Sequence, residues 1–286
     1  APMCRHDSLI GVVEAVNSRR PDGFCTRDER VMSFLAMQAA MAIENARLYQ
    51  ENINQARLTA LGQGIAGAAH CIKNILNSVG AGAYILDKGV EREDFERIGK
   101  GWEILKRNTD MMRDLVLDML TYSRPRDPVF QVSDVSELCT DVANLVTERA
   151  RAAGVDLIVD LNPDVGEIAI DPKGIYRSLL NLVSNAVDAC AKKESGGEVQ
   201  LAAHLGEARK NVIITVADNG CGIDRDHLKK VFAAFFSTKG SKGTGLGLAV
   251  TEKIIQEHDG TITVTSEVDK GTKFTISLPA RRTVPH

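Results

Sequence analysis

The 286-residue chain lacks several features that would place it in a broad functional class. It has no basic excess, because 35 lysines and arginines stand against 38 acidic residues, so nucleic-acid binding has no electrostatic support. Its six cysteines lack the Cys-x-x-Cys and Cys/His spacing of metal sites, and no segment resembles a secretory signal. These absences favour a protein of the reducing cytoplasm.

A long apolar run is also missing. The longest weakly charged stretch, residues 58–86, is interrupted by Lys73 and contains many polar residues, whereas a membrane span needs about 20 mainly apolar ones. We therefore expect no membrane segment within this sequence. Because the chain starts without methionine, in what reads as the middle of a domain, we expect it to be a fragment of a longer protein.

Proline is absent between residues 26 and 88, where the periodicity is helical almost throughout. Thr26 followed by Glu29 has the pattern of a capping box, so we predict one helix from residue 26 to about residue 88. Apolar residues at spacings of three and four form one seam along it. The seam consists of Leu61, Ile65, Ala68, Ile72, Leu76 and Val79.

A second helix is predicted from about residue 95 to Ser123, where two prolines follow. A short reversal at residues 89–93 joins the two helices into a hairpin. Because a hairpin buries its seam poorly alone, we expect a second copy to complete a four-helix bundle. This predicts a homodimer, with the hairpin domain spanning residues 51–127.

Short alternating elements occupy residues 128–286, which we predict to be a separate domain of the α+β class. The economical packing is a sandwich in which one antiparallel sheet carries helices on one face. The predicted helices span 133–153, 171–192 and 245–258, and the predicted strands span 155–160, 167–170, 197–205, 211–217, 261–266 and 272–278.

Two segments of this domain suit a metal ion and a base. Asn181 and Asn185 lie four residues apart on one helix face, and their amide oxygens suit a hard cation such as Mg²⁺. Asp218 directly follows a predicted strand, where a fixed carboxylate can accept a hydrogen bond from an adenine amino group. Gly220 and Gly222 let the backbone come close to a flat base.

Two further segments suit phosphates. Residues 232–242 offer aromatic anchors followed by a mobile cationic tip, and residues 243–247 (GTGLG) open the last helix. Unpaired N–H groups and the helix dipole favour phosphate at such a helix start. The predicted nucleotide contacts in these segments are Phe236, Thr238, Lys239, Gly243, Thr244, Gly245, Leu246 and Gly247.

The four segments, in this order, resemble the GHKL ATPase superfamily, and within it most closely the histidine kinases. The resemblance covers 129–279 and implies a Bergerat-type fold that binds ATP and Mg²⁺. It implies that Asn185 is the magnesium ligand, that Asp218 reads the adenine, and that Lys239 and the GTGLG glycines contact the phosphates. Gly271 and Thr272 resemble the last motif of the fold, with Thr272 near the adenine.

Two positions bear on the reaction. Asn181 stands where the gyrase and MutL branches have a glutamate, and an amide cannot take a proton from water, which favours a kinase over a free ATPase. Asp188 departs from the basic or aromatic residue of many histidine kinases, which leaves the phosphate contact at that position unassigned.

The segment LGQGIAGAAHCIKNIL on the first helix resembles the phosphoacceptor box of histidine kinases, with His70 as the phosphoacceptor. At 100° per residue, His70, Lys73 and Asn74 fall opposite the apolar seam, so we expect His70 to be exposed. The resemblance implies autophosphorylation of His70 and transfer to an aspartate of a response-regulator receiver domain. Asn74 matches a polar residue used to dephosphorylate the regulator.

Cys71 departs from this family, which usually has an acid after the histidine. A thiol is mostly neutral at pH 7 and accepts hydrogen bonds weakly. No acid occurs between Glu51 and Asp87, and folding about residue 90 brings the level of His70 near Asp110. We hypothesise slow autophosphorylation unless Asp110, or an acid from the ATP domain, compensates.

Residues 1–50 resemble the end of a GAF sensory domain and its exit helix; the alternative is a plain dimerisation helix. Two other functions also fit the motifs. One is an ATP-binding regulatory scaffold or phosphatase-biased pseudokinase, consistent with Cys71, and the other is a GHKL ATPase with a non-catalytic stem.

Overall fold

A computed structural model of the protein describes the backbone of residues 1–286 except 6–7, 19, 21–22, 124–126, 192, 194–195, 240–242, 282 and 284–286. The side chains of residues 5, 8, 53–54, 56–66, 70 and 208 also lie outside the described part. The chain divides into two compact units, Ala1–Ala60 and Leu61–His286, and each is described by itself.

The first unit contains an antiparallel strand pair and the start of a long helix. Strand β1 (Pro2–Arg5) pairs with β2 (Ser8–Val12) in an antiparallel register. Helix α1 (Thr26–Glu91) begins where predicted, but the capping differs. The carboxylate of Asp28 accepts a hydrogen bond from the backbone N–H of Cys25 at 3.0 Å, so the cap is one residue earlier than the predicted box.

In the second unit, the carboxyl-terminal part of α1 packs against α2 (Phe95–Ser123), which confirms the helical hairpin. Glycines allow a close approach of the two helices. A Cβ atom on Gly101 would lie 2.7 Å from the backbone nitrogen of Leu86, and one on Gly89 would lie 2.8 Å from that of Ile98. The reversal falls at residues 92–94, and the Asp94 carboxylate caps α2 through the N–H of Arg97.

The predicted apolar seam of α1 faces two directions. Ala68 and Ile75 are buried, whereas Ile72 is 38% and Leu76 54% exposed. Two inner positions are therefore offset by one residue from the predicted set, because Cys71 and Ile75 cluster with Leu115 of α2 in place of Ile72 and Leu76, whereas Val79 packs against this cluster as predicted. Ile72 and Leu76 form a separate apolar stripe that the single chain does not cover.

Residues after the hairpin form a five-stranded sheet with the order β4-β6-β7-β9-β8. The prediction of a wholly antiparallel sheet is wrong, because β4 runs parallel to β6. Helix α4 lies between β4 and β6 in the chain and supplies the crossover that parallel strands require. In addition, β5 pairs outside this sheet, with β3. The strands are β3 (Gln131–Asp134), β4 (Val155–Leu161), β5 (Glu167–Ile170), β6 (Gly197–Leu205), β7 (Asn211–Asp218), β8 (Thr261–Glu267) and β9 (Gly271–Pro279).

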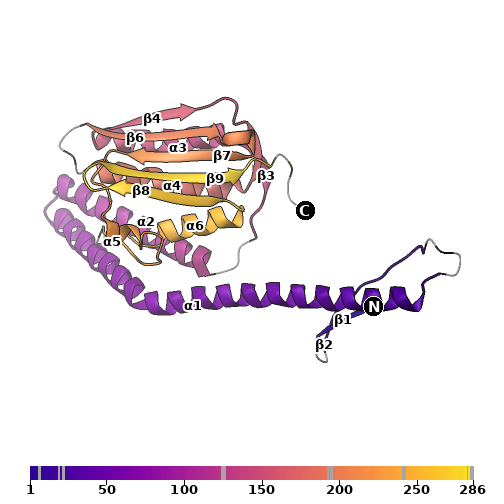
Figure 1. The fold of residues 1–286 in the computed structure, drawn as a ribbon. Helices are drawn as coiled ribbons and strands as arrows, with labels where there is room; N and C mark the ends of the chain where they lie inside the picture. Colours follow the sequence, from indigo (N-terminus) through magenta and orange to yellow (C-terminus); the bar gives the residue numbers. More distant parts are fainter. Residues whose placement is uncertain are drawn as a thin grey trace. The chain divides into compact units, whose positions relative to one another are not determined.

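Helices α3 (Val135–Ala152), α4 (Pro172–Cys190) and α6 (Gly247–Glu257) cover one face of this sheet, as predicted (Figure 1). Alternate residues of the strands point into the core, and α4 lies at its centre with Ile175, Leu179 and Leu182 almost fully buried. Two short helical segments, Glu207–Arg209 and α5 (Arg225–Leu228), complete the described elements. The packing places the carboxyl-terminal half of α4 beside the start of α6.

Candidate nucleotide site and its contact with the hairpin

The two asparagines of α4 are hydrogen-bonded to each other. Asn185 Nδ2 donates to Asn181 Oδ1 at 3.2 Å, and Asn181 Nδ2 donates to Thr251 Oγ1 of α6 at 3.0 Å. Asn185 Oδ1 accepts from the Lys239 ammonium at 2.6 Å. The prediction that both amides share one helix face is therefore confirmed. The Asn185 Oδ1 oxygen already contacts a cation, the Lys239 ammonium.

Asp218 ends β7, and Thr272 is its partner residue on β9. The Asp218 carboxylate accepts the N–H of Gly220 at 2.9 Å, and burial raises the pKa of this carboxyl despite its hydrogen bonds to the backbone of Gly220 and Thr272. Thr272 is buried, and its hydroxyl contacts Ser266 Oγ at 3.0 Å. The residues predicted to read the adenine thus lie side by side.

The glycines of DNGCG allow close contact with the backbone of neighbouring segments. A Cβ on Gly220 would lie 2.6 Å from the carbonyl carbon of Ala189, and one on Gly222, where φ is +66°, would lie 2.0 Å from the Glu267 oxygen. The space at Gly271 is smaller still: its φ is +113°, and a Cβ there would lie 1.9 Å from the backbone carbonyl oxygen of Asp218. These glycines hold the Asp218 turn against α4 and β9, a packing reason that the sequence reading did not include.

The GTGLG loop (residues 243–247), which is predicted to bind phosphate, packs against α4. A Cβ on Gly247 would lie 2.5 Å from Asn181 Oδ1, and one on Gly245, where φ is +69°, would lie 2.5 Å from the carbonyl carbon of Phe235. Gly243 approaches Ser237 Oγ in the same way. The GTGLG loop therefore reaches the asparagine pair directly, and Gly247 begins α6 there.

Other predicted phosphate and base contacts lie around this loop. Phe236 stacks at a tilt on His227, with ring centroids 5.4 Å apart, and Thr238 is exposed. Thr244 Oγ1 accepts the N–H of Leu246 at 3.3 Å, which orders the loop before α6. The rest of the predicted cationic tip, residues 240–242, lies outside the described residues.

Asp188 and Arg149 add a charged group that sequence reasoning missed. Asp188 Oδ1 accepts from Arg149 Nη2 of α3 at 2.5 Å, and its Oδ2 accepts from Lys239 Nζ at 2.8 Å. Arg149 lies 39 residues from Asp188, so no local pattern reveals the pair. One signal could have revealed the pair. Asp188 stands where many histidine kinases have a basic or aromatic residue, so a compensating cation is expected near it.

The ATP half also contacts the hairpin. Leu246, from the phosphate loop, is fully buried in a cluster with Cys71 and Ile75 of α1 and Leu115 of α2. A Cβ on Gly67 would lie 3.2 Å from Phe235 Cβ. The loop and the segment before it thus cover α1 on both sides of position 70.

Polar bonds support the same contact, and sequence reasoning missed them too. Arg177 of α4 pairs with Asp118 at 2.5 Å and donates to Thr121 Oγ1 at 3.0 Å. Lys253 of α6, 2% exposed, donates to the carbonyl of Thr121 at 2.5 Å. The Thr121 carbonyl belongs to the last turn of α2, where helix carbonyls have no intrahelical partner, so the Lys253 ammonium of α6 caps α2.

Asp110 does not lie at the level of His70 in the hairpin, in contrast to the expectation from the sequence. Cys71 packs with Leu115, five residues and more than one turn beyond Asp110, because α1 continues to Glu91 and shifts the reversal from residue 90 towards residue 93. Asp110 itself is half-exposed and pairs with Arg113 at 3.0 Å. The buried acid nearest the Leu115 level is Asp118, whose carboxyl pKa burial raises while Arg177 opposes the shift.

His70 lies within α1, but its side chain is outside the described part, so its predicted exposure is not addressed. Asn74 is partly buried, and Lys73 is exposed as predicted. Cys71 is buried, and burial raises the pKa of its thiol. Within the described residues, no helix is long and apolar enough to cross a membrane.

Residues 170–282, which contain the asparagine pair, the Asp218 turn and the GTGLG loop, match the family described as histidine kinase-, DNA gyrase B-, and HSP90-like ATPase. This part of the chain is an ATP-binding domain of that family. The ATPase domain accounts for the predicted GHKL resemblance, whereas no comparison bears on the GAF-like segment.

The chain that carries this ATPase domain is also similar to complete kinases. Sensor histidine kinase ZraS of Escherichia coli (strain K12) is 34% identical over 242 residues, covering 82% of this chain and 49% of ZraS. Signal transduction histidine-protein kinase AtoS of Escherichia coli (strain K12) is 33% identical over 224 residues, covering 78% of this chain and 35% of AtoS. The chain therefore spans about half or less of the length of these curated relatives.

Solved structures agree with the fold. Histidine kinase ThkA in complex with response regulator protein TrrA matches with a TM-score of 0.66 and 26% identity, covering 82% of this chain and 66% of that chain. Full-length ShkA in complex with AMPPNP matches with a TM-score of 0.56 and 25% identity, covering 66% of this chain and 40% of that chain. The predicted succession of a helical hairpin and an α/β-sandwich ATPase domain is confirmed.

Proposed function

We propose that the chain is the catalytic core of a sensor histidine kinase, which binds Mg-ATP, autophosphorylates on His70 and passes the phosphoryl group to an aspartate of a response regulator. One observation carries this proposal. Phe235, from the segment before the GTGLG loop, lies against Gly67, and Leu246 of the loop is buried in one cluster with Cys71, so the ATPase domain packs on α1 at residues just before and just after His70 in the chain.

The nucleotide contacts divide by chemistry. Asp218, with Gly220, Gly222 and the neighbouring Thr272, is assigned to the adenine. Asn181, Lys239 and the GTGLG loop are assigned to the phosphates, and Phe236 and Thr238 to the lid over them. A helix start favours phosphate through its unpaired N–H groups and dipole, and the Lys239 ammonium adds a positive charge beside it. The carboxyl of Asp218 offers the acceptor oxygen for the exocyclic amino group of adenine.

Mg²⁺ fits the donor set around Asn185. The Lys239 ammonium, a cation, already lies 2.6 Å from Asn185 Oδ1 and 2.8 Å from Asp188 Oδ2. Oxygen donors of this kind suit Mg²⁺, which keeps several waters and takes few protein ligands. When bound, the ion would spread the negative charge of the β- and γ-phosphates.

The proposed reaction is an in-line displacement. A neutral imidazole nitrogen of His70 forms a bond to the γ-phosphorus while the bond to the bridging oxygen breaks, and ADP leaves. The raised pKa keeps Cys71 a neutral thiol, so it does not act as the base. Asn74 is proposed for regulator dephosphorylation. Asp110 is proposed only as a residue to test, because the pairing of α1 with α2 places Leu115, and not Asp110, at the level of Cys71.

The hairpin is proposed to form a homodimer. Ile72, Leu76, Trp102 and Val116 expose between 38% and 60% of their surface on α1 and α2, which a second copy would cover. A receiver domain is the proposed second partner, since ThkA was solved with its response regulator. We further propose a cytoplasmic location, a hairpin domain at residues 51–127, an ATPase domain at 128–286 and a GAF-like end at 1–50.

One observation favours a second function. Because Cys71 is buried and replaces the usual acid, the chain would instead be an ATP-binding scaffold or a phosphatase-biased pseudokinase if His70 is not phosphorylated. The third candidate is a free ATPase, which Asn181 disfavours because an amide does not accept a proton from water.

Labelling with γ-phosphate-labelled ATP separates the three functions. We expect acid-labile label on the parent chain and none on His70→Gln or Asn185→Ala. Nucleotide binding without any labelled protein would establish the scaffold, and release of free phosphate without phosphoprotein would establish the ATPase. Asp110→Asn is run in parallel, and an unchanged rate excludes that residue.

A further inference from the structure

Asp188, near the carboxyl-terminal end of α4, pairs with two cations. Its Oδ1 accepts from Arg149 Nη2 at 2.5 Å, and its Oδ2 accepts from Lys239 Nζ at 2.8 Å. Lys239 also donates to Asn185 Oδ1 at 2.6 Å, so the whole group adjoins the proposed magnesium ligand. An acid at this position needs an explanation, because the expected ligand is a polyphosphate.

The charges of the group explain how an acid is tolerated. An isolated carboxylate here would repel the phosphates, whereas one carboxylate with two cations has a net charge of +1. Removing Arg149 would leave only the neutral Asp188–Lys239 pair. The guanidinium is therefore needed, beside Lys239, for this corner of the site to carry a net positive charge.

The geometry of a guanidinium suits the exchange that phosphate binding would require. Its five N–H donors form a fork that matches phosphate oxygens, and the contact with Asp188 uses one nitrogen. The Arg149 side chain is 56% exposed and that of Asp188 37% exposed. An ion pair this exposed is weak, so the guanidinium can reorient at little cost in free energy. Arg149 can then donate to a ligand through its other N–H groups while one of them still contacts Asp188.

We propose that Arg149 binds the terminal phosphate of the nucleoside triphosphate, and that Asp188 is the residue that positions it. Arg149 on α3 thereby supplies the cation that position 188 does not. This rests on the proposed ATP site and deepens it, because it assigns the residue that distinguishes a triphosphate from a diphosphate at that site.

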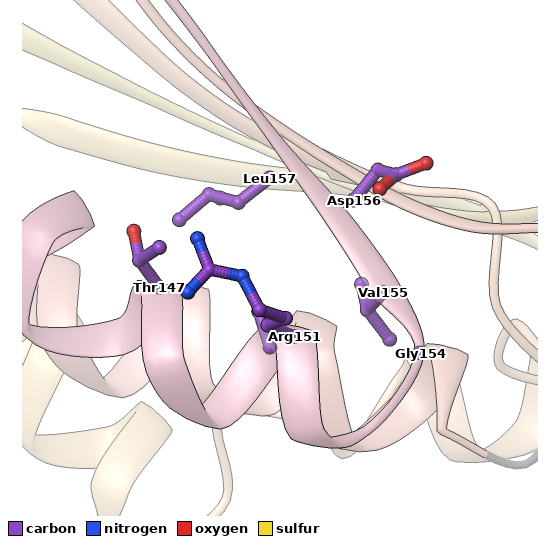
Figure 2. A pocket seen from close by; sticks show the side chains of 7 residues that line it. Thr147, Arg151, Gly154, Val155, Asp156 and Leu157 are labelled. Atoms are coloured by element: carbon purple, nitrogen blue, oxygen red, sulfur yellow. The ribbon is translucent and has the colours of Figure 1, made fainter.

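Arg151 provides a matched control on the same helix. Two residues correspond to about 200° around a helix, so Arg149 and Arg151 point to opposite sides of α3. Arg151 pairs with Glu148 at 2.6 Å. Its side chain lies across a surface hollow between Thr147 and Leu157, which contains no residue of the proposed site (Figure 2).

The test measures calorimetric binding of AMPPNP and of ADP, each with Mg²⁺, to the whole chain. Arg149→Gln is expected to weaken AMPPNP binding roughly tenfold and ADP binding less than twofold, because one charge-assisted contact is lost. Arg149→Lys is expected to be intermediate, and Arg151→Gln to leave both affinities within about twofold. Equal weakening of both nucleotides, or of neither, by Arg149→Gln overturns the proposal.

The role of Asp188 is read from a double-mutant cycle. In an Asp188→Asn background, Arg149→Gln is expected to change AMPPNP affinity by about twofold or less, because the arginine is no longer positioned. A full tenfold effect in that background removes Asp188 from the proposal. If the parent chain binds neither nucleotide, the ATP site itself fails, which differs from intact binding that is insensitive to Arg149.

Discussion

The ATPase domain and the helical hairpin bury their apolar residues very differently. In the ATPase domain, Ile175, Leu179 and Leu201 are fully buried, and the sheet and helices cover one another. On the hairpin, Phe95, Trp102 and Leu76 are 83%, 60% and 54% exposed. The domain closes its own core within one chain, whereas the hairpin has an apolar surface that the described part of its own chain leaves exposed.

The strongest test of the self-contained domain is Gly271→Ala. A Cβ there would lie 1.9 Å from the Asp218 oxygen at φ +113°, so we expect the unfolding free energy of the ATPase domain to fall by at least about 3 kcal/mol. Urea denaturation measures it. Gly154→Ala is the control, because its φ is +68° but no atom lies within 4 Å, and strain alone costs about 1–2 kcal/mol. Equal losses would contradict the packing argument.

The open surface of the hairpin is tested by Leu76→Glu. If a second copy covers this leucine, a charge there should weaken dimerisation by at least about 2 kcal/mol, roughly thirtyfold in dissociation constant. Light scattering over a concentration series measures it. Asn77→Glu, also exposed and one position along, is expected to have little effect. Unchanged association with Leu76→Glu would mean that the stripe is not the interface.

The boundary between the two regions is tested by Asp118→Ala, which removes the acid that pairs with Arg177 at 2.5 Å. We expect a loss of about 1–2 kcal/mol in the contact between α2 and the ATPase domain. Faster hydrogen exchange at the end of α2, with unchanged exchange in α4, is the expected readout. Asp114→Ala, an exposed acid on the same helix, serves as the control. Faster exchange throughout both regions would show general destabilisation instead.

The smallest stability effect is expected for Asp218→Asn. Burial raises the folded-state pKa of this carboxyl above its unfolded value, so the parent gains stability as the pH falls through the folded pKa towards about 3.8. The asparagine variant lacks this gain, and at pH 7 it should lie within about 1 kcal/mol of the parent or slightly above. Denaturation at pH 7 and pH 4 measures the difference. A parent that loses stability relative to the variant on acidification contradicts this sign.

Much of the architecture follows from local patterns. The bounds of α1 and α2 were predicted to within three residues, because proline placement and helical periodicity act over short distances. The asparagine pair was recognised because helix spacing alone places both amides on one face. The parallel pairing of β4 and β6 was missed, because alternation along a strand does not specify its neighbour's direction.

The sequence by itself determined the helical hairpin and the helix face that Asn181 and Asn185 share, since these depend on periodicity and spacing. Only the tertiary structure decided the Cys71–Leu115 register, the capping of α2 by Lys253, and the pairing of Asp188 with Arg149. The physical reason is distance along the chain. These contacts join residues tens of positions apart, so their partners are chosen by how whole helices pack.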